Sequence, residues 1–492
     1  MMLNAVSMPL QSFFNESVYD HYGIVLDTQG MSLVVSFMPN IDLCGFLVSL
    51  LFVIPMMDTR GRRFVSVYMR TFSVIISASL FITAKYTNSI ELYALAQFFL
   101  GFVQPMKMIV VKIYLTRWQS KYINKTVNPV FPLGESVPNS YRGLMAIAIG
   151  SCLIFASMLA TVLFFPSMFG NSDSWQFVPV MCAGMEILYF CFASWLPESP
   201  KWLMDAGQSK EKIIKSIKFY HGEDEIDKVM KDIQEEIDLS AHHRMSLRDV
   251  YRNQTFRSVF MIIFMSLLTS SLSMVVITQN YTQQLLLMFG YSVENVFLLT
   301  GILQVAFIPL IIINPFLYER LGRRPMFLFS SFCSLINIFL FFSAQLLTDL
   351  SGGSSSLSFV LATLAMIFNS IAGYTGIVIG FVVFIADLLP PGAKVSVTQF
   401  VLLANLVIQI PVMFLFGNLL TAVGSWTFVP FFVVQIAIFV YMYLNLPETK
   451  QQSVVTNVHN LQDHLHLSSR SRSTTITSEK TQLLTHRKGY GT

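Results

Sequence analysis

Two short basic motifs contain the residue types and spacing that are best suited to chemistry in this chain. They read DTRGRR at 58–63 and ERLGRR at 319–324, and each lies between two long apolar stretches. Arginine forms bidentate, charge-assisted hydrogen bonds with carboxylates, so such turns are suited to reversible ion pairing between helix ends. The sequence contains no nucleophile elbow, phosphate-binding loop or zinc helix, so no enzyme activity is predicted.

The elements that would position these motifs are membrane-spanning helices. Hydrophobic residues make up 54% of the chain and charged residues 12%, whereas soluble domains carry about 25% charge. Apolar windows of about 20 residues, which cross a bilayer core, predict about eleven spans, at 32–57, 64–84, 91–116, 144–168, 175–196, 257–279, 295–317, 326–347, 357–386, 396–420 and 425–446. We therefore expect an all-α membrane protein of two related halves, as in many transporters.

Polar segments divide the chain into five expected parts. These are an N-terminal segment like an outer loop, an N-terminal transmembrane half, a helical connector, a C-terminal transmembrane half and a disordered tail, at 1–31, 32–196, 197–256, 257–446 and 447–492. Lysine and arginine accumulate in cytosolic loops, which places both Gly-Arg-Arg turns, the connector and the tail in the cytosol. The five cysteines all fall in apolar stretches without regular spacing, so neither a disulfide framework nor a metal site is predicted.

Four further motifs accompany the basic pair. They are ESVPNSYRG at 135–143, PESPKWL at 197–203, ADLL at 386–389 with Gly392 and Lys394, and PETK at 447–450. In their order and spacing, these motifs resemble the sugar-porter branch of the major facilitator superfamily, particularly the animal hexose facilitators. The resemblance implies the major facilitator fold, with two six-helix-type halves, and alternating-access transport of a hexose or related carbohydrate without a cofactor.

The resemblance also implies a latch of acidic and basic side chains that breaks when the cytosolic mouth opens. In the first half Arg62 and Arg63 would pair with Glu135 and Glu198, in a group that includes Arg142. In the second half the members would be Glu319, Arg323, Arg324, Asp387, Lys394 and Glu448. Ordinary positive-inside topology is the alternative reading, and it would explain the arginines but not the matched acids.

The expected substrate site departs from the hexose pattern. Ser270 and Ser271 stand where the family has a glutamine pair, and only Asn405 stands where the family has a sugar-binding asparagine. Tyr281, through which these positions align with the family, is a further candidate for the substrate site. A sugar hydroxyl buried without a partner costs about 1–3 kcal/mol, so the loss of amides argues against a glucose-specific site.

Three charged residues fall inside predicted spans, namely Asp42, Lys107 and Glu186. Each costs on the order of 2.5–3.5 kcal/mol to insert, which makes each a candidate functional residue. Lys107 would either contact an anionic substrate or pair with Asp42 or Glu186 to fasten helices. No carboxylate can be assigned to proton coupling, so facilitated diffusion is favoured over proton symport.

The chain departs from the family pattern at two places. The segment FFNESVYDHYG at 13–23 resembles the first outer loop, with a glycosylation sequon at Asn15, yet no apolar span precedes it and residues 1–30 lack the features of a signal peptide. The first helix of the family is therefore expected to be missing. Residues 117–134 separate elements that the family joins directly, and they are interpreted as an insertion or a translated intron.

The tail carries a possible sorting signal, because Glu479, Leu483 and Leu484 match the acidic dileucine pattern that clathrin adaptors read. The plasma membrane is the expected location, with an endolysosomal membrane as the alternative. The expected partners are a small sugar-like or anionic substrate and the lipid bilayer, with no nucleic acid. A membrane sensor or adaptor that has the fold without flux, and an organic-anion transporter, remain as alternative functions.

Overall fold

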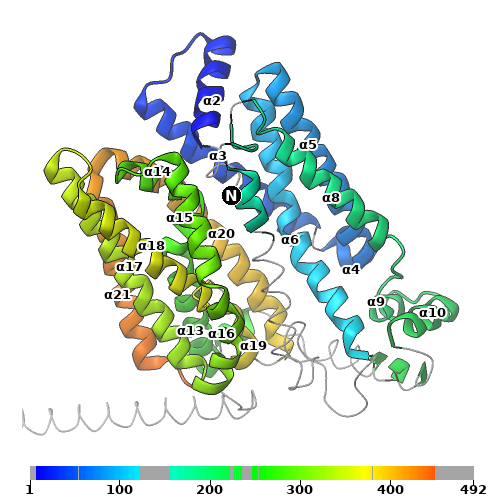
Figure 1. Ribbon diagram of the computed structural model, residues 1–492. Helices are drawn as coiled ribbons and strands as arrows, with labels where there is room; N and C mark the ends of the chain where they lie inside the picture. The colour runs from blue at the N-terminus through cyan, green and yellow to red at the C-terminus, as the bar shows by residue number, and fades with distance from the viewer. Residues whose placement is uncertain are drawn as a thin grey trace, which may run out of the picture.

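A computed structural model describes residues 7–53, 55–120, 156, 158–165, 167–171, 173–221, 226–227, 229–231, 233–234, 247–252, 254–378, 380–389 and 391–448. These residues form helices and connecting turns, with no strand among them. The helices gather into two bundles (Figure 1). The first bundle contains α2 (Ser7–Tyr22), α3 (Thr28–Val48), α5 (Arg70–Thr87), α6 (Ile90–Ser120) and α8 (Phe177–Ala193).

The second bundle contains α13 (Gln254–Ser271), α14 (Met274–Met288), α15 (Val293–Ala306), α16 (Ile308–Leu321), α17 (Arg323–Ser351), α18 (Ser356–Tyr374), α19 (Gly380–Leu388), α20 (Pro391–Val423) and α21 (Phe428–Asn445). Shorter helices join them, namely α4 (Met56–Arg60), α9 (Pro200–Asp205), α10 (Lys210–His221) and α12 (Leu247–Arg252). The chain is thus an all-α protein of two helical halves with a helical connector.

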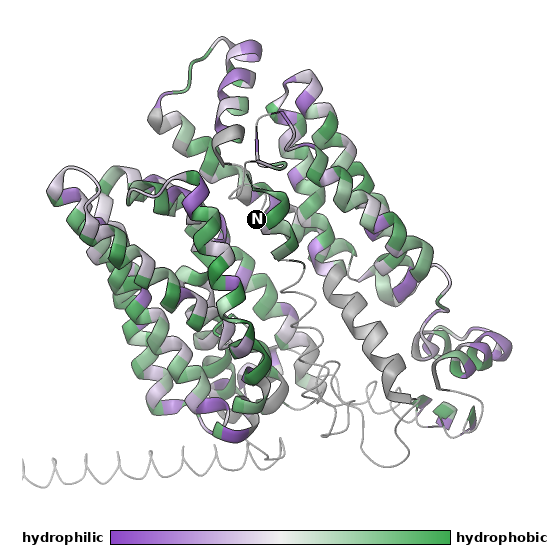
Figure 2. Cartoon of the chain, in the orientation of Figure 1, coloured by the Kyte–Doolittle hydropathy of each residue, from purple (hydrophilic) through white to green (hydrophobic). Residues whose placement is uncertain are grey.

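Seven stretches of the described residues are long and apolar enough to cross a membrane. They are Leu33–Val53, Phe64–Thr87, Phe256–Met288, Val293–Asn314, Arg323–Ser351, Ser356–Tyr374 and Ser396–Asn445, and the apolar helix Phe177–Ala193 is shorter. Three of the stretches run from one α-helix into the next, namely from α13 into α14, from α15 into α16 and from α20 into α21. Apolar colour is widespread along the helices of both bundles (Figure 2), as expected for membrane-spanning helices.

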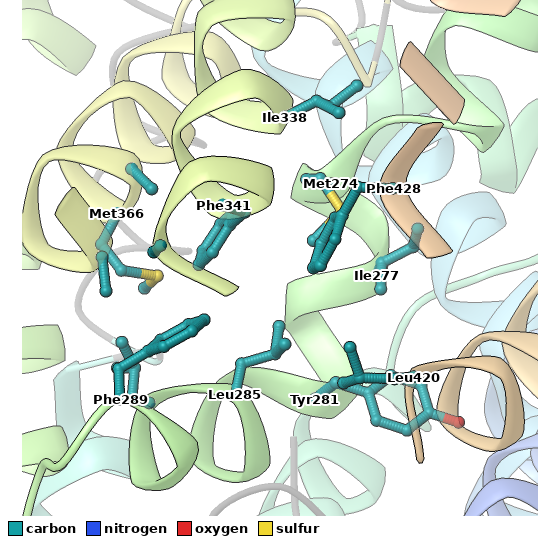
Figure 3. Close-up of a cluster of buried hydrophobic side chains, with 14 of the residues drawn as sticks. Met274, Ile277, Tyr281, Leu285, Phe289, Ile338, Phe341, Met366, Leu420 and Phe428 are labelled. Atoms are coloured by element: carbon teal, nitrogen blue, oxygen red, sulfur yellow. The ribbon is translucent and has the colours of Figure 1, made fainter. Parts of the chain in front are cut away.

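The core of the second half is built around α14. Its buried residues Met274, Ile277, Tyr281 and Leu285 share one helical face, because they recur every three or four positions, and buried Phe289 follows directly after its end. They pack against side chains of α17, α18, α20 and α21, several of them aromatic (Figure 3). This core fixes the position of α14 relative to its four neighbours.

The first half depends on close contact between α3 and α6. A Cβ atom added to Gly101 would lie 1.8 Å from the carbonyl oxygen of Asp42, and one added to Gly45 would lie 2.0 Å from that of Phe98. Only glycine allows the two backbones to approach so closely. The pair of helices is therefore a rigid unit, and it positions the intramembrane residue Asp42.

The segment expected to be an outer loop is largely helical. Leu10, Phe13 and Phe14 lie on one face of α2 and are buried against Tyr93 of α6 and Trp175, with which the two phenylalanine rings form tilted and edge-on contacts. The Oγ of buried Ser17 accepts a hydrogen bond of 2.8 Å from the N–H of Ile90. This apolar face is spaced for a helix, which is why the segment packs onto the first bundle.

Candidate functional site

In the first half, the turn between α4 and the next helix binds a carboxylate with its backbone. The N–H of Arg63 donates to both oxygens of Glu198, at 3.2 and 3.0 Å. The Arg62 guanidinium donates to the Oγ of Ser199 at 3.2 Å, and the Arg63 guanidinium donates to the carbonyl of Ser194. Glu198 belongs to the PESP motif that opens the connector, so this cap ties the connector to the first basic turn.

The second half repeats this geometry. The N–H groups of Arg323 and Arg324 donate to Oε1 and Oε2 of Glu448, at 3.0 and 3.2 Å. The Arg324 guanidinium donates to the carbonyl of Tyr443 at 2.8 Å. Free N–H groups at a helix start favour negative charge, so each glutamate binds the beginning of a helix that follows a Gly-Arg-Arg turn.

The glycine in each turn is required by the carboxylate. Gly61 and Gly322 have φ values of +98° and +102°, a conformation that side chains rarely adopt. A Cβ atom would lie 2.5 Å from Oε2 of Glu198 at the first turn and 2.6 Å from Oε2 of Glu448 at the second. The repeated motif is thus a matched pair of carboxylate-binding turns, one in each half.

The other residues of the expected latch are only partly described. Glu135 and Arg142 lie outside the described residues, as do Glu479, Leu483 and Leu484 of the tail. Glu319, Asp387 and Lys394 lie in or beside α16, α19 and α20, but their side chains are outside the described set. Among the described members, Arg63 meets Glu198, and Arg323 and Arg324 meet Glu448, through backbone N–H groups, while Arg62 donates to Ser199 beside Glu198.

Of the expected substrate residues, the structure brings Ser271 and Asn405 together. The Oγ of Ser271 lies 2.7 Å from Oδ1 of Asn405, and Nδ2 of Asn405 lies 3.5 Å from Oε1 of Gln409 one turn further along α20. Ser270 instead donates to the carbonyl of Val378 at 3.3 Å. These groups lie beside the break between α13 and α14, and together they offer hydroxyl and amide groups of the kind that a sugar needs.

Tyr281 lies where the two halves meet. Its hydroxyl donates to the carbonyl of Met413 at 2.7 Å, and its ring is buried. Ser36 of α3 approaches from the other half, since a Cβ on Gly417 of α20 would lie 2.5 Å from its Oγ and 3.2 Å from the Tyr281 hydroxyl. This arrangement gives Tyr281 a place in the contact between the halves.

Further contacts between the halves lie nearby. Thr161 donates to Oε1 of Gln304 at 3.2 Å, and the rings of Phe165 and Phe297 meet edge to face with centroids 5.9 Å apart. Helix α15, which carries Phe297 and Gln304, begins at the end of the second half that lies opposite the Gly322 turn. The two Gly-Arg-Arg turns define what we call the basic side, and these contacts lie toward the opposite side.

Glu186 has a partner that was not expected from the sequence. Its Oε2 lies 2.7 Å from Nη2 of Arg70 on α5, and its Oε1 accepts from the hydroxyl of Thr71 at 3.3 Å. The Arg70 guanidinium also lies over the ring of Tyr189, 4.1 Å from its centroid. Arg70 and Glu186 thus form an ion pair that joins α5 to α8, while the side chain of Lys107 lies outside the described residues.

Three further residues that were singled out in the sequence lie in or near helices of the first bundle. Asp42 lies on α3 at its contact with α6, and Lys107 lies on α6 with its side chain outside the described set. The Oδ1 of Asn15 accepts from the N–H of Leu26 at 3.1 Å, which holds the end of α2 near the start of α3. Within the described part of the chain, no group of His, Cys, Asp and Glu could hold a metal ion.

Sequence reasoning missed four residues that the structure brings forward. Arg70 was visible as a charge inside the predicted span 64–84, and that signal would have identified a partner for Glu186. Gln409 lies one turn from Asn405, which is the usual spacing for side chains on one helical face. Ser36 and Gly417 carried no signal, because small residues mark a helix contact only once the partner helix is known.

Comparisons with known proteins agree with this architecture. The family described as "Sugar (and other) transporter" matches residues 1–457. The human "Solute carrier family 2, facilitated glucose transporter member 5" is 21% identical over 454 residues, covering 92% of this chain and 86% of the relative. Human member 7 is also 21% identical, over 473 residues, which cover 92% of this chain and 85% of the relative. The inward-open xylose transporter XylE from E. coli has a TM-score of 0.67 at 15% identity, covering 94% of this chain and 97% of that chain.

Proposed function

Because this chain belongs to the family of sugar and other transporters, we propose that it carries a hexose or a related small carbohydrate across the membrane. The mechanism is alternating access, in which two halves rock about a central site. Relatives named as facilitated glucose transporters and as a xylose transporter support this class of substrate.

The observation that carries the proposal is the distribution of contacts between the two sides. On the basic side, each half is held within itself, by Glu198 at the first turn and by Glu448 at the second. Toward the opposite side the halves hold each other, through Ser36 with Gly417 and through Thr161 with Gln304. This arrangement suits a transporter that is closed on the opposite side and opens on the basic side when its halves rotate.

The substrate site is proposed to lie at the break between α13 and α14. Ser271, Asn405 and Gln409 supply a hydroxyl and two amides within one connected group. Ser270, Tyr281 and Lys107 complete the proposed set, and Lys107 would matter most for an anionic substrate. A site with two amides suits a molecule with several hydroxyls, because each hydroxyl can then donate and accept.

Facilitated diffusion is proposed in preference to proton symport. Glu186, an intramembrane carboxylate, forms an ion pair of 2.7 Å with Arg70 and accepts a hydrogen bond of 3.3 Å from Thr71. These contacts join α5 to α8, so a structural role explains the charge without proton coupling. We therefore expect uptake that follows the sugar gradient and is unaffected by a pH gradient.

The test is uptake of radiolabelled sugars into proteoliposomes, with glucose, fructose, polyols and small organic anions compared. Asn405→Ala should reduce uptake at least tenfold, because it removes both the amide and the partner of Ser271. Asn445→Ala is the matched control, since Asn445 is exposed at the end of α21 and its Nδ2 donates only locally, to Tyr441 at 2.9 Å. Saturable uptake of anions alone, or none from folded protein, would contradict the proposal.

The location is proposed to be the plasma membrane. The dileucine residues Leu483 and Leu484 supply the means of testing it, because a working adaptor signal removes a protein from the cell surface. We expect replacing both with alanine to leave the surface fraction of the full chain unchanged in a biotinylation assay. A marked rise in that fraction would instead favour an endolysosomal membrane.

A further inference from the structure

Helix α10 of the connector has two unlike faces. Ile213, Ser216 and Ile217 are buried against α9 and its neighbours. Lys212, Lys215 and Lys218 are exposed, and a 100° step per residue places all three on the side opposite the buried face. The helix is therefore packed on one side and presents a row of lysines on the other.

The composition of the exposed face is that of a helix that lies on a membrane. Besides the lysines it carries Phe219, which is 40% exposed, and a single acid, Glu211. Lysines interleaved with an aromatic side chain bind anionic headgroups by charge while the ring enters the boundary with the acyl chains.

Helix α10 lies close in the chain to the end of the apolar helix α8. Helix α8 ends at Ala193 and α9 begins at Pro200, so a short link joins α8 to the connector. Trp195 in this link is 87% exposed, as expected for an aromatic residue at the membrane boundary. Both α9 and α10 lie beside the basic-side end of α8 (Figure 1).

The same helix is fixed to the first carboxylate-binding turn. The Oγ of fully buried Ser216 donates to the carbonyl of Glu198 at 2.5 Å, and the carboxylate of Glu198 accepts from the N–H of Arg63. A force on the lysine face is therefore transmitted to the turn through two hydrogen bonds.

From these observations we propose that the lysine face of α10 is a binding surface for anionic phospholipids of the leaflet on the basic side. The headgroup phosphates and carboxylates pair with Lys212, Lys215 and Lys218, while Phe219 enters the boundary region. The bound lipid holds the connector, and with it the Glu198 cap, at a fixed height relative to the membrane.

The test is lysine footprinting of the full chain in nanodiscs. A neutral acylating reagent is applied in phosphatidylcholine discs and in discs with about one third phosphatidylserine, and mass spectrometry gives the rate at each lysine. We expect phosphatidylserine to slow modification of Lys212, Lys215 and Lys218 at least threefold. High salt near 1 M, where the screening length is about 3 Å, should remove the protection. Lys85, at the opposite side on α5, reports any general effect of surface charge.

Two variants should change the protection by phosphatidylserine in opposite directions. Glu211→Gln removes the only acid on the face and should increase the protection, whereas Phe219→Ser should reduce it without changing charge. Equal rates in the two kinds of disc, or equal slowing at Lys85, would overturn the proposal, as would full protection by soluble glycerophosphoserine. The readout does not involve flux, so it stands apart from the uptake test of the proposed function.

Discussion

At the residue scale, the glycines of the two basic turns should be among the least replaceable positions in the chain. Gly322→Ala would force a Cβ into a φ of +102° and to within 2.6 Å of Glu448. Backbone strain of this kind costs about 1–3 kcal/mol, and loss of the carboxylate contact adds to it. We therefore expect a clear fall in the melting temperature of the detergent-solubilised protein.

The control for this substitution is Gly352→Ala. Gly352 also has a positive φ, +67°, but nothing lies within 4 Å of an added Cβ. A fall that is equal for both variants would mean that conformation alone matters and that Glu448 does not hold the turn.

The sequence predicted which residues meet at these turns, but not which of their atoms form the hydrogen bonds. The motifs identified Arg63 and Glu198, and Arg324 and Glu448, as members of one group, and the structure brings each pair together. The contacts that bring them together include donation from backbone N–H groups. Side-chain identity can be read from the sequence, whereas a backbone donor becomes visible only when the turn has a conformation.

At the element scale, the packing of α5 against α8 should depend on the Arg70–Glu186 pair. Arg70→Met or Glu186→Leu alone leaves a buried charge without its partner, which costs about 3–5 kcal/mol. The double variant Arg70→Met with Glu186→Leu removes both charges, so most of that loss should be recovered. Thermal unfolding of the three variants in one detergent measures the coupling.

Additive losses in this cycle would show that the two side chains act separately. The matched control is a cycle between Arg70→Met and Glu211→Gln, because Glu211 lies exposed on α10 and is distant in the chain. That pair should show no coupling.

Helices were predictable from the sequence to different degrees. Long apolar stretches such as those of α17 and α18 follow directly from hydropathy, since a span needs only about 20 apolar residues. Helix α2 was expected to be an outer loop because residues 13–23 resemble the first outer loop of the hexose facilitators. Its partners Tyr93 and Trp175 are distant in sequence, and only their contact shows why Phe13 and Phe14 are buried.

At the scale of the whole molecule, the duplicated motif predicted two halves, but not which side of the membrane is closed. The closed side is the one where helices of opposite halves approach closely, and here Gly417 allows that approach. Gly417→Ala would place a Cβ 2.5 Å from the Oγ of Ser36. Overpacking costs about 1–3 kcal/mol, enough to shift the ratio of two states about 5- to 150-fold, so the halves should separate on the side opposite the basic turns.

Electron–electron distance measurements between spin labels at Tyr86 and Leu350, both highly exposed near the ends of α5 and α17, would report this separation. The distance should lengthen in Gly417→Ala and return in the double variant with Ser36→Gly, because the oxygen that meets the new methyl group is then absent. Gly301→Ala is the control at the same interface, since its Cβ would lie 3.9 Å from the nearest atom, on Thr161. An unchanged distance in Gly417→Ala, with the protein still folded, would mean that the contact of α3 with α20 does not hold the closed side together.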